Sequence, residues 1–190
     1  MSSMNDNKIT KFESELRLAE LSPKNSLVKA GFKENMTLCD IGAGTGVFTF
    51  PATELSNNDI YALEISDNML ELLSSRMAER NIKNLKLKKV DSTTLPLDNN
   101  SCDMAIMVTV LHEVETKEIM LDEIKRILKQ KGRLMIIEFH KRKTPMGPSV
   151  DQRISEEYVE EISNSKGFKT INKVSLGDNF YSVIFESALN

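Results

Sequence analysis

The chain has 190 residues, 40% of them hydrophobic and 28% charged, a composition that predicts one folded domain with a single core rather than two domains or a disordered chain. Its 25 lysines and arginines against 28 acidic residues give a net charge of −3, which argues against a nucleic-acid partner. The sequence starts without the basic flank and apolar run of a secretion signal, and its apolar stretches fall far short of the ~20 residues that cross a bilayer. We therefore expect a cytoplasmic protein with no membrane span.

The two cysteines of the chain, Cys39 and Cys102, each lie inside an apolar run. Domains stapled by disulfides or folded around a metal carry more cysteines, at characteristic spacings. We therefore expect two reduced, buried thiols rather than a disulfide, and no metal site.

Short apolar or β-branched runs alternate along the chain with longer segments of helical spacing, which is typical of βαβ units around a parallel sheet. The predicted strands are, in chain order, residues 37–41, 59–64, 85–90, 104–108, 132–138, 169–175 and 181–186. The predicted helices are residues 9–21, 23–30, 46–55, 67–80, 115–129 and 155–165. Residues 176–179 are too few for a crossover helix, so the last two strands should form an antiparallel hairpin at one edge of the sheet.

A glycine-rich turn, Asp40-Ile-Gly-Ala-Gly-Thr-Gly46, joins the first predicted strand to a helix. Glycine permits a tight turn there and lets a ligand approach the backbone closely. A dinucleotide fingerprint would place its third glycine at position 47, where Val47 stands, and no Lys-Ser or Lys-Thr follows as in a phosphate loop. Glu64 ends the second strand 22 positions after Gly42, where an acidic side chain reaches the hydroxyls of a ribose.

Five segments in this order resemble the successive motifs of the class I S-adenosylmethionine-dependent methyltransferases: the turn at 40–46, Glu64, Asp91, and the runs at 102–114 and 129–138. Within that family, the chain is most similar to the group of the ubiquinone and menaquinone biosynthesis methyltransferases. The resemblance covers nearly the whole sequence. It implies a Rossmann-like three-layer α/β sandwich with a seven-stranded, mostly parallel sheet and S-adenosylmethionine as the cofactor.

The length leaves no room for a separate substrate domain, so we expect one methyltransferase domain over residues 1–190, in which a helical lid segment, 1–33, precedes a catalytic core, 34–190. The acceptor would then be a small, partly apolar molecule, chosen by the lid and by the loop around Pro145. We expect Phe12 and Arg17 to belong to the lid, and Met146 and Tyr181 to line an apolar acceptor pocket.

Carried over to this chain, the resemblance implies a cofactor site along the strand ends. Asp40 would support the loop and the ammonium of the cofactor, and Glu64 would bind both ribose hydroxyls. The remaining implied contacts are the backbone of Gly42, Ala43, Gly44 and Gly46 at the methionine part, Ile65 and Met69 on the adenine face, Asp91 and Ser92 at the adenine amino group, and Val108 and Thr109 under the sulfonium.

His112 follows the fourth strand, where the transferred methyl should emerge, and its pKa near neutrality suits a base that activates the acceptor. The alternative is that His112 caps the next helix or packs structurally. The basic run at 140–143 also has two interpretations, because it can receive an anionic acceptor or form a solvated loop.

Two other functions stay open beside methyl transfer to a small molecule. One is a catalytically silent regulator or accessory protein that binds S-adenosylmethionine, and the other is an NAD-dependent oxidoreductase, which Val47 disfavours. Residues 108–111 lack the Asn/Asp-Pro-Pro-aromatic motif of amino-directed nucleic-acid methyltransferases. The sequence leaves open the acceptor, the methylated atom and whether the protein is a monomer or a homodimer.

Overall fold

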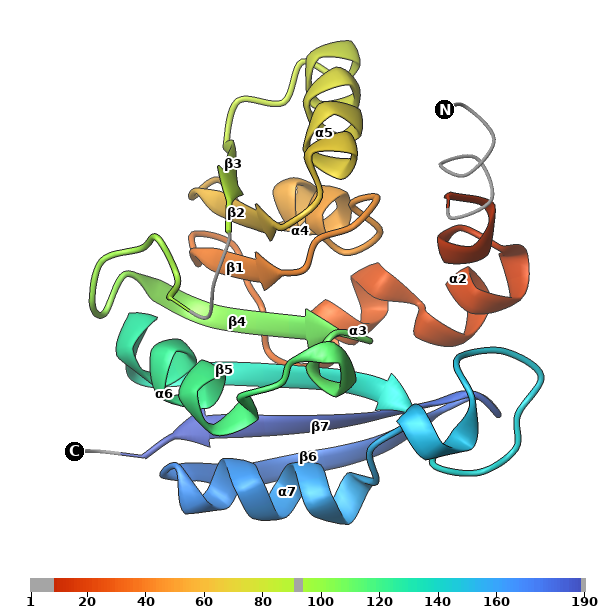
Figure 1. Ribbon diagram of the computed structural model, residues 1–190. Coiled ribbons are helices and arrows are strands. Elements are labelled where there is room, and N and C mark those ends of the chain that lie inside the picture. The colour runs from red at the N-terminus through yellow and green to blue at the C-terminus, as the bar shows by residue number, and fades with distance from the viewer. Residues whose placement is uncertain (1–8, 91–93, 189–190) are drawn as a thin grey trace.

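The structure, a computed structural model, describes residues 9–90 and 94–188. In this part of the chain seven strands form one sheet in the order β3-β2-β1-β4-β5-β7-β6 (Figure 1). The strands are β1 (Leu38–Ile41), β2 (Ile60–Glu64), β3 (Leu85–Lys89), β4 (Cys102–Val108), β5 (Leu128–Phe139), β6 (Phe168–Leu176) and β7 (Phe180–Ser187). The first five strands pair in parallel, and β7 runs antiparallel to both β5 and β6. The predicted α/β fold and its C-terminal hairpin are confirmed.

Helices cover both faces of the sheet (Figure 1). They are α2 (Glu15–Leu21), α3 (Pro23–Lys29), α4 (Thr49–Leu55), α5 (Asp67–Glu79), α6 (Lys117–Ile127) and α7 (Glu156–Ser165). One apolar core joins the sheet to α6 and α7, through Ile124 and Val159 among others, and a second joins it to α3, α4 and α5. Alternate strand residues point to opposite faces, so Leu38 packs in the second core while Cys39 packs in the first.

The order of the strands fixes where a ligand can bind. From β1 the chain proceeds outward to β2 and β3, and it then returns to the other side of β1 to form β4 and β5. In open α/β sheets, such a reversal leaves a crevice at the carboxyl ends of the two central strands. Here the crevice lies between β1 and β4, and Figure 1 shows α2 beyond those strand ends.

Two predicted helices differ from the structure. Residues 9–12 are helical, but Ser14 is extended and α2 begins only at Glu15, while the preceding Glu13 forms an ion pair with Arg76 of α5. The predicted helix 115–129 ends at Ile127, because the following residue pairs with Cys102 and begins β5. In both cases long-range pairing overrides helical spacing.

Both cysteines are free and fully buried, as predicted, with Cys39 in β1 and Cys102 in β4. Burial raises the pKa of the Cys39 thiol well above its ordinary value, and the contact with Cys102 adds to this. Over residues 9–90 and 94–188, three or more potential metal-ligating side chains nowhere gather into one group. None of the helices described there is long and apolar enough to cross a membrane.

Candidate active site

A cavity of about 940 Å³ opens in the crevice, a size near the upper end of the ~300–1,000 Å³ range of small-molecule sites. Its wall includes nine of the residues predicted to bind the cofactor: Asp40, Gly42, Ala43, Gly44, Glu64, Ile65, Met69, Val108 and Thr109. Phe12, Arg17 and Leu21 from the N-terminal segment line the same space. Asp91 and Ser92 lie outside the described residues.

The three glycines of the turn after β1 all have positive φ, but they differ in what surrounds them. A Cβ on Gly44 would meet no atom closer than Phe12, at 3.8 Å, so this part of the loop offers open space to a ligand. A Cβ on Gly46 would lie 2.4 Å from Phe50 and 2.8 Å from Leu73. Gly46 is absent from the cavity wall, and it allows α4 and α5 to pack against the loop.

Glu64, at the end of β2, is 7% exposed and is held by three backbone N–H groups. Oε2 accepts a hydrogen bond from Gly44 at 2.8 Å, and Oε1 accepts from Ile65 at 2.8 Å and from Ser66 at 2.9 Å. A carboxylate offers about four acceptor positions, so this conformation leaves room for one further hydroxyl. For Glu64 to bind both hydroxyls of a ribose, the hydrogen bond from the Gly44 N–H to its Oε2 would have to break.

Asp40 lies at the base of the loop and is 2% exposed. Its Oδ2 accepts a hydrogen bond of 2.6 Å from the Thr49 hydroxyl. Burial raises the pKa of Asp40 to about 7, the hydrogen bond from Thr49 opposes this rise, and the nearby charge of Glu64 adds to it. A cationic group in the cavity would favour the ionised form, so Asp40 suits a ligand that carries a positive charge.

Apolar groups and one strained residue complete this part of the wall. Ile65 is 68% exposed, which leaves a large apolar side chain open to a flat ring, whereas Met69 is buried beside it. Thr109 directly follows β4 and has a φ of 56°, which is unusual for a β-branched residue. Its backbone N–H donates to Ile137 at 2.7 Å, and its hydroxyl accepts from Arg17 at 2.9 Å. These bonds hold strain of the kind that concentrates at functional sites.

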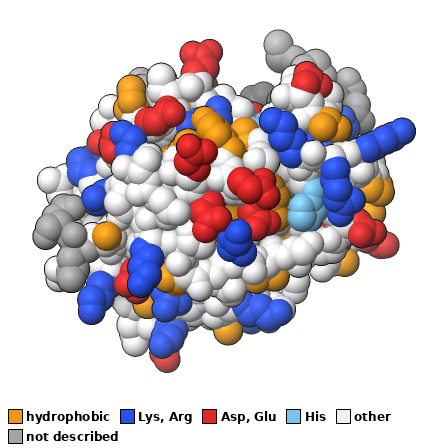
Figure 2. All heavy atoms as spheres, turned by 90° about the horizontal axis from the view of Figure 1, so that it is seen from below, with side chains coloured by type: hydrophobic (Ala, Val, Ile, Leu, Met, Phe, Trp, Pro, Cys, Tyr) orange, Lys and Arg blue, Asp and Glu red, His pale blue; other side chains and the backbone are white. Residues whose placement is uncertain are grey.

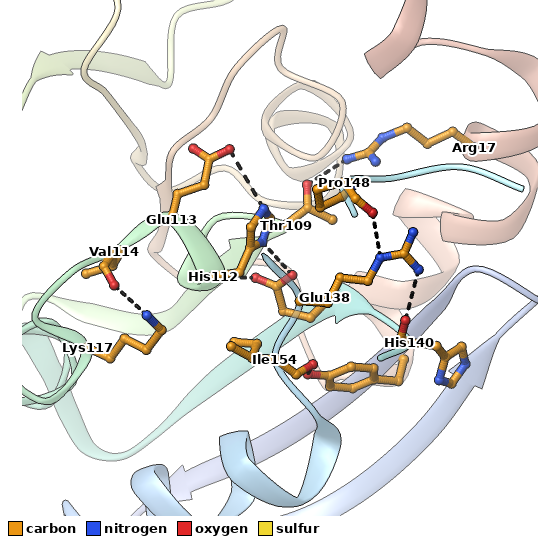
Figure 3. Close-up of polar contacts among 12 residues, drawn as sticks. Arg17, Thr109, His112, Glu113, Val114, Lys117, Glu138, His140, Pro148 and Ile154 are labelled. Carbon is orange, nitrogen blue, oxygen red and sulfur yellow. Dashed lines mark hydrogen bonds and ion pairs between the residues drawn. The ribbon is translucent and has the colours of Figure 1, made fainter. Parts of the chain in front are cut away.

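His112 lies in the 3₁₀ turn η1 (Leu111–Glu113) and pairs with Glu138 near the end of β5 (Figure 3). The distance between His112 Nδ1 and Glu138 Oε2 is 2.8 Å, and Oε1 accepts from the His112 backbone N–H at 3.1 Å. A carboxylate only accepts, so the proton lies on Nδ1 and Nε2 is left as the basic nitrogen. His112 is not itself among the residues that line the cavity, but its Nε2 lies 3.8 Å from Oε1 of Glu113, which does line it.

The environment tunes His112 toward proton transfer. Burial by itself would lower the pKa of His112, but the hydrogen bond and the charge of Glu138 outweigh it, so the pKa is raised. Glu138 is 1% exposed and was not among the residues predicted for the site. A signal for it exists in the sequence, because an acid inside the apolar run of a central strand needs a buried partner.

Residues 32–186 match the sequence profile of a methyltransferase domain family. The chain belongs to this family. It is 29% identical over 126 residues to the ubiquinone/menaquinone biosynthesis C-methyltransferase UbiE of Idiomarina loihiensis, a match that covers 65% of this chain and 49% of that one. For the enzyme of the same name from Azotobacter vinelandii the identity is 30% over 115 residues, covering 59% and 46%. The chain thus spans about half the length of these curated relatives.

Solved structures agree with this assignment. A SAM-dependent methyltransferase from Aquifex aeolicus superposes with a TM-score of 0.89 at 26% identity, over 96% of this chain and 98% of that one. The [4+2]-cyclase SpnF superposes with a TM-score of 0.78 at 16% identity, over 90% and 81%. S-adenosylmethionine is therefore the cofactor of this methyltransferase domain. The likeness to the cyclase shows that the fold alone does not name the reaction.

Two predictions about the acceptor side of this methyltransferase domain are not supported. Tyr181 is fully buried and donates its hydroxyl hydrogen bond to the Ile154 carbonyl at 3.0 Å, so it belongs to the core. Met146 is also absent from the cavity wall. Of the basic run, His140 lies 3.1 Å from the Ser175 hydroxyl, and residues 141–143 are exposed. The exposure of residues 141–143 fits a solvated loop. Figure 2 views the molecule from the side of β6 and α7 and shows acidic and basic side chains side by side on that face.

Proposed function

We propose that this methyltransferase domain transfers a methyl group from S-adenosylmethionine to a small-molecule acceptor, and that His112 removes the acceptor's proton. The observation that carries the proposal is that the glycine loop and Glu64 share one cavity with Val110 and Glu113, which flank His112 in the chain, and that His112 pairs with Glu138. When bound, the cofactor supplies a methyl carbon activated by a positively charged sulfur. The protein then has to position the acceptor, exclude water and accept a proton.

The loop and the end of β2 would hold the cofactor. Gly44 offers the open backbone, Glu64 offers a fixed carboxylate to the ribose, and Asp40 supplies the negative charge that an ammonium needs. Ile65 and Met69 would pack on the adenine, and Val108 and Thr109 would lie under the sulfonium. The roles assigned to Asp91 and Ser92 at the adenine amino group rest on the family resemblance.

His112 would act in its neutral form. Its Nε2 accepts the acceptor's proton as the new bond to the methyl carbon forms, while Nδ1 donates to Glu138 throughout. The carboxylate of Glu138 fixes the orientation of the ring and stabilises the imidazolium that results. His112 would then release its proton to solvent, which restores its neutral form.

A small, partly apolar acceptor fits the wall that the N-terminal segment contributes. Phe12, Arg17 and Leu21 reach the cavity from residues 1–33, and we propose that this segment closes over the bound molecules as a lid. The curated relatives are C-methyltransferases of quinone biosynthesis, which favours an acceptor with an acidic carbon or hydroxyl. Such a group is one whose proton a histidine of raised pKa can remove.

Calorimetry and labelled transfer test the proposal in two steps. The protein is titrated with S-adenosylmethionine, S-adenosylhomocysteine and NAD, and binding of the first two without NAD is the expected result. A metabolite extract is then incubated with methyl-labelled cofactor and either the wild type or His112→Ala. Tight NAD binding without S-adenosylhomocysteine binding would overturn the proposal. Cofactor binding with no acceptor-dependent product would favour a silent binding protein.

A further inference from the structure

Arg17 of α2 is a buried cation with few partners. It is 8% exposed, lines the cavity and, within the described residues, has a single hydrogen bond, from Nη2 to the Thr109 hydroxyl at 2.9 Å. Its Nε is also buried and finds no hydrogen-bond partner in the part of the chain that the structure describes. A guanidinium carries five N–H donors, and burying such a charge without an anion is costly. Burial lowers the pKa of Arg17 to about 10, partly offset by the charge of Glu138, so the side chain is charged at neutral pH.

Arg153, a second buried arginine of this fold, has a purely structural role and can be compared with Arg17 by its hydrogen-bond partners. Its exposure is 5%, and, like Arg17, it lies over the Phe139 ring, at 5.4 Å against 5.7 Å for Arg17. Arg153 donates five hydrogen bonds within the loop it closes, to the carbonyls of Pro148, His140, Arg142 and Met146 and to the Thr144 hydroxyl. Arg17 lacks such a set of acceptors, so its position in the cavity wall calls for a different explanation.

The neighbours of Arg17 place it on the acceptor side of the crevice. Its guanidinium lies 5.7 Å from the ring of Phe139 at the end of β5 and 5.2 Å from that of Phe180 at the start of β7. In the sheet these strands lie beyond β4, whereas Glu64 lies on β2, on the other side of β1. Figure 3 shows Arg17 reaching Thr109 on the same side as the pair of His112 and Glu138.

We propose that Arg17 binds a carboxylate of the methyl acceptor and thereby orients it against His112, an inference that rests on the proposed function. The guanidinium supplies parallel donors that match the two oxygens of a carboxylate. The three phenylalanines around it, Phe12, Phe139 and Phe180, hold its plane by cation–π contacts. Phe12 and Val110, which line the cavity, leave an apolar surface for the rest of the acceptor. The substrate class is therefore an organic acid with an apolar body.

The charges of the cavity agree with this assignment. Asp40 and Glu64 make the cofactor side acidic, and they would repel an anionic acceptor from it. Glu113, beside His112, also lines the cavity, but its side chain is 76% exposed, so solvent screens its charge. On the N-terminal wall, Lys11 adds an exposed cation to the buried one of Arg17. The basic residues 141–143 are exposed away from the cavity, which leaves Arg17 as the cation built into its wall.

Matched neutral and anionic probes test the inference. The protein loaded with S-adenosylhomocysteine is titrated with benzoate and phenylacetate, each against its primary amide, and binding is followed by nuclear magnetic resonance. The variants are Arg17→Met, which keeps the apolar stem, and Arg17→Lys, which keeps the charge but loses the planar fork. Arg80→Met is the control, because Arg80 lies over Phe50 at 4.3 Å in a separate cavity and loses a cation–π contact of the same kind.

We expect the acids to bind the wild type at least tenfold more tightly than the amides. Arg17→Met should abolish that preference, Arg17→Lys should retain part of it, and Arg80→Met should leave it unchanged. Equal binding of acids and amides to the wild type, or a preference that survives in Arg17→Met, would overturn the inference. Unfolding curves of each variant exclude a loss caused by misfolding.

A second titration separates the acceptor from the cofactor, which has a carboxylate of its own. S-adenosylhomocysteine and 5′-methylthioadenosine share the nucleoside, but the latter lacks the amino-acid part. If Arg17→Met weakens the first ligand much more than the second, the anion belongs to the cofactor and the assignment to the acceptor is wrong. If the wild type fails to bind S-adenosylhomocysteine, the proposed function fails instead, and the acid and amide titrations of the free protein still report on Arg17.

Discussion

The two sides of the cavity are built in different ways. Most of the cofactor side that lines the cavity comes from residues 40–46 and 64–69, which are close together in sequence, and only Val108 and Thr109 are added from β4 and the residue after it. Backbone N–H groups of the two nearby segments fix the carboxylate of Glu64. The acceptor side joins side chains from distant segments, such as Arg17 to Thr109 and His112 to Glu138. A short local motif can therefore build much of the cofactor side, whereas we expect substitutions in the distant pairs to change how the acceptor is bound.

The two sides also differ in charge. Asp40 and Glu64, which line the cavity, suit a molecule that carries a positive sulfur and an ammonium. The proposed roles of Arg17 and His112 are to bind an acid and to remove its proton. Because the two sides of the cavity carry opposite charges, each ligand would be attracted to one side and repelled from the other. Substitutions on one side should consequently change one property of the protein and spare the other.

His112→Ala should give the largest difference between the effect on turnover and the effect on cofactor binding. Loss of a general base typically slows a reaction by about 10²- to 10⁴-fold, so methyl transfer should fall within that range. The affinity for S-adenosylhomocysteine should stay within about twofold, because His112 lies on the acceptor side. Turnover is measured with labelled cofactor and binding by calorimetry, and normal turnover would return His112 to a structural role.

Glu64→Ala should weaken cofactor binding and leave ligand binding on the acceptor side intact. Charge-assisted hydrogen bonds contribute about 1.5–3 kcal/mol each, so the affinity for S-adenosylhomocysteine should fall by about ten- to a hundredfold. Binding of the benzoate probe should persist. Since Glu64 also accepts from Gly44, the unfolding free energy of the variant has to be measured alongside. Unchanged cofactor affinity would refute the role of Glu64 at the ribose.

A substitution within the glycine loop should separate folding from binding. Gly46→Ala places a methyl 2.4 Å from Phe50 at a φ of +86°, so the unfolding free energy should fall by about 1–3 kcal/mol. Gly44→Ala meets nothing closer than 3.8 Å and should lose less stability but more cofactor affinity. Denaturant unfolding and calorimetry compare the two variants. Equal losses of stability would contradict the separate roles assigned to these glycines.

The sequence predicted the cofactor side better than the acceptor side, for a physical reason. Residues 40–46 form a glycine-rich turn after a strand, and Glu64 lies at a strand end. Such local features determine the path of the backbone, so they can be predicted from the sequence. Glu138 was missed because its partner lies 26 positions earlier, and Tyr181 was misplaced because strand alternation does not say which buried face meets the cavity. Local patterns determine elements and loops, whereas partners across the fold depend on how the sheet is assembled.

Glu138→Gln should alter the pH profile of methyl transfer. The carboxylate holds the pKa of His112 above its ordinary value, so the wild-type rate should rise with pH as His112 loses its proton at that raised pKa. Removing the negative charge lowers the pKa of His112, and the rising limb should move to lower pH with a reduced plateau. A limb that stays in place would show that another group is titrating.

The smallest effect is expected for Asp40, on the cofactor side. Because its pKa is raised to about 7, a cationic ligand must drive a proton off this carboxyl, so affinity for S-adenosylhomocysteine should rise with pH up to about 7 and then level off. Asp40→Asn should flatten this dependence, and 5′-methylthioadenosine, which lacks the ammonium, should show little of it in the wild type. Equal pH dependence for the two ligands would mean that the ammonium does not lie near Asp40. Glu64 would then be the one carboxylate of the cavity's cofactor side that acts on the cofactor.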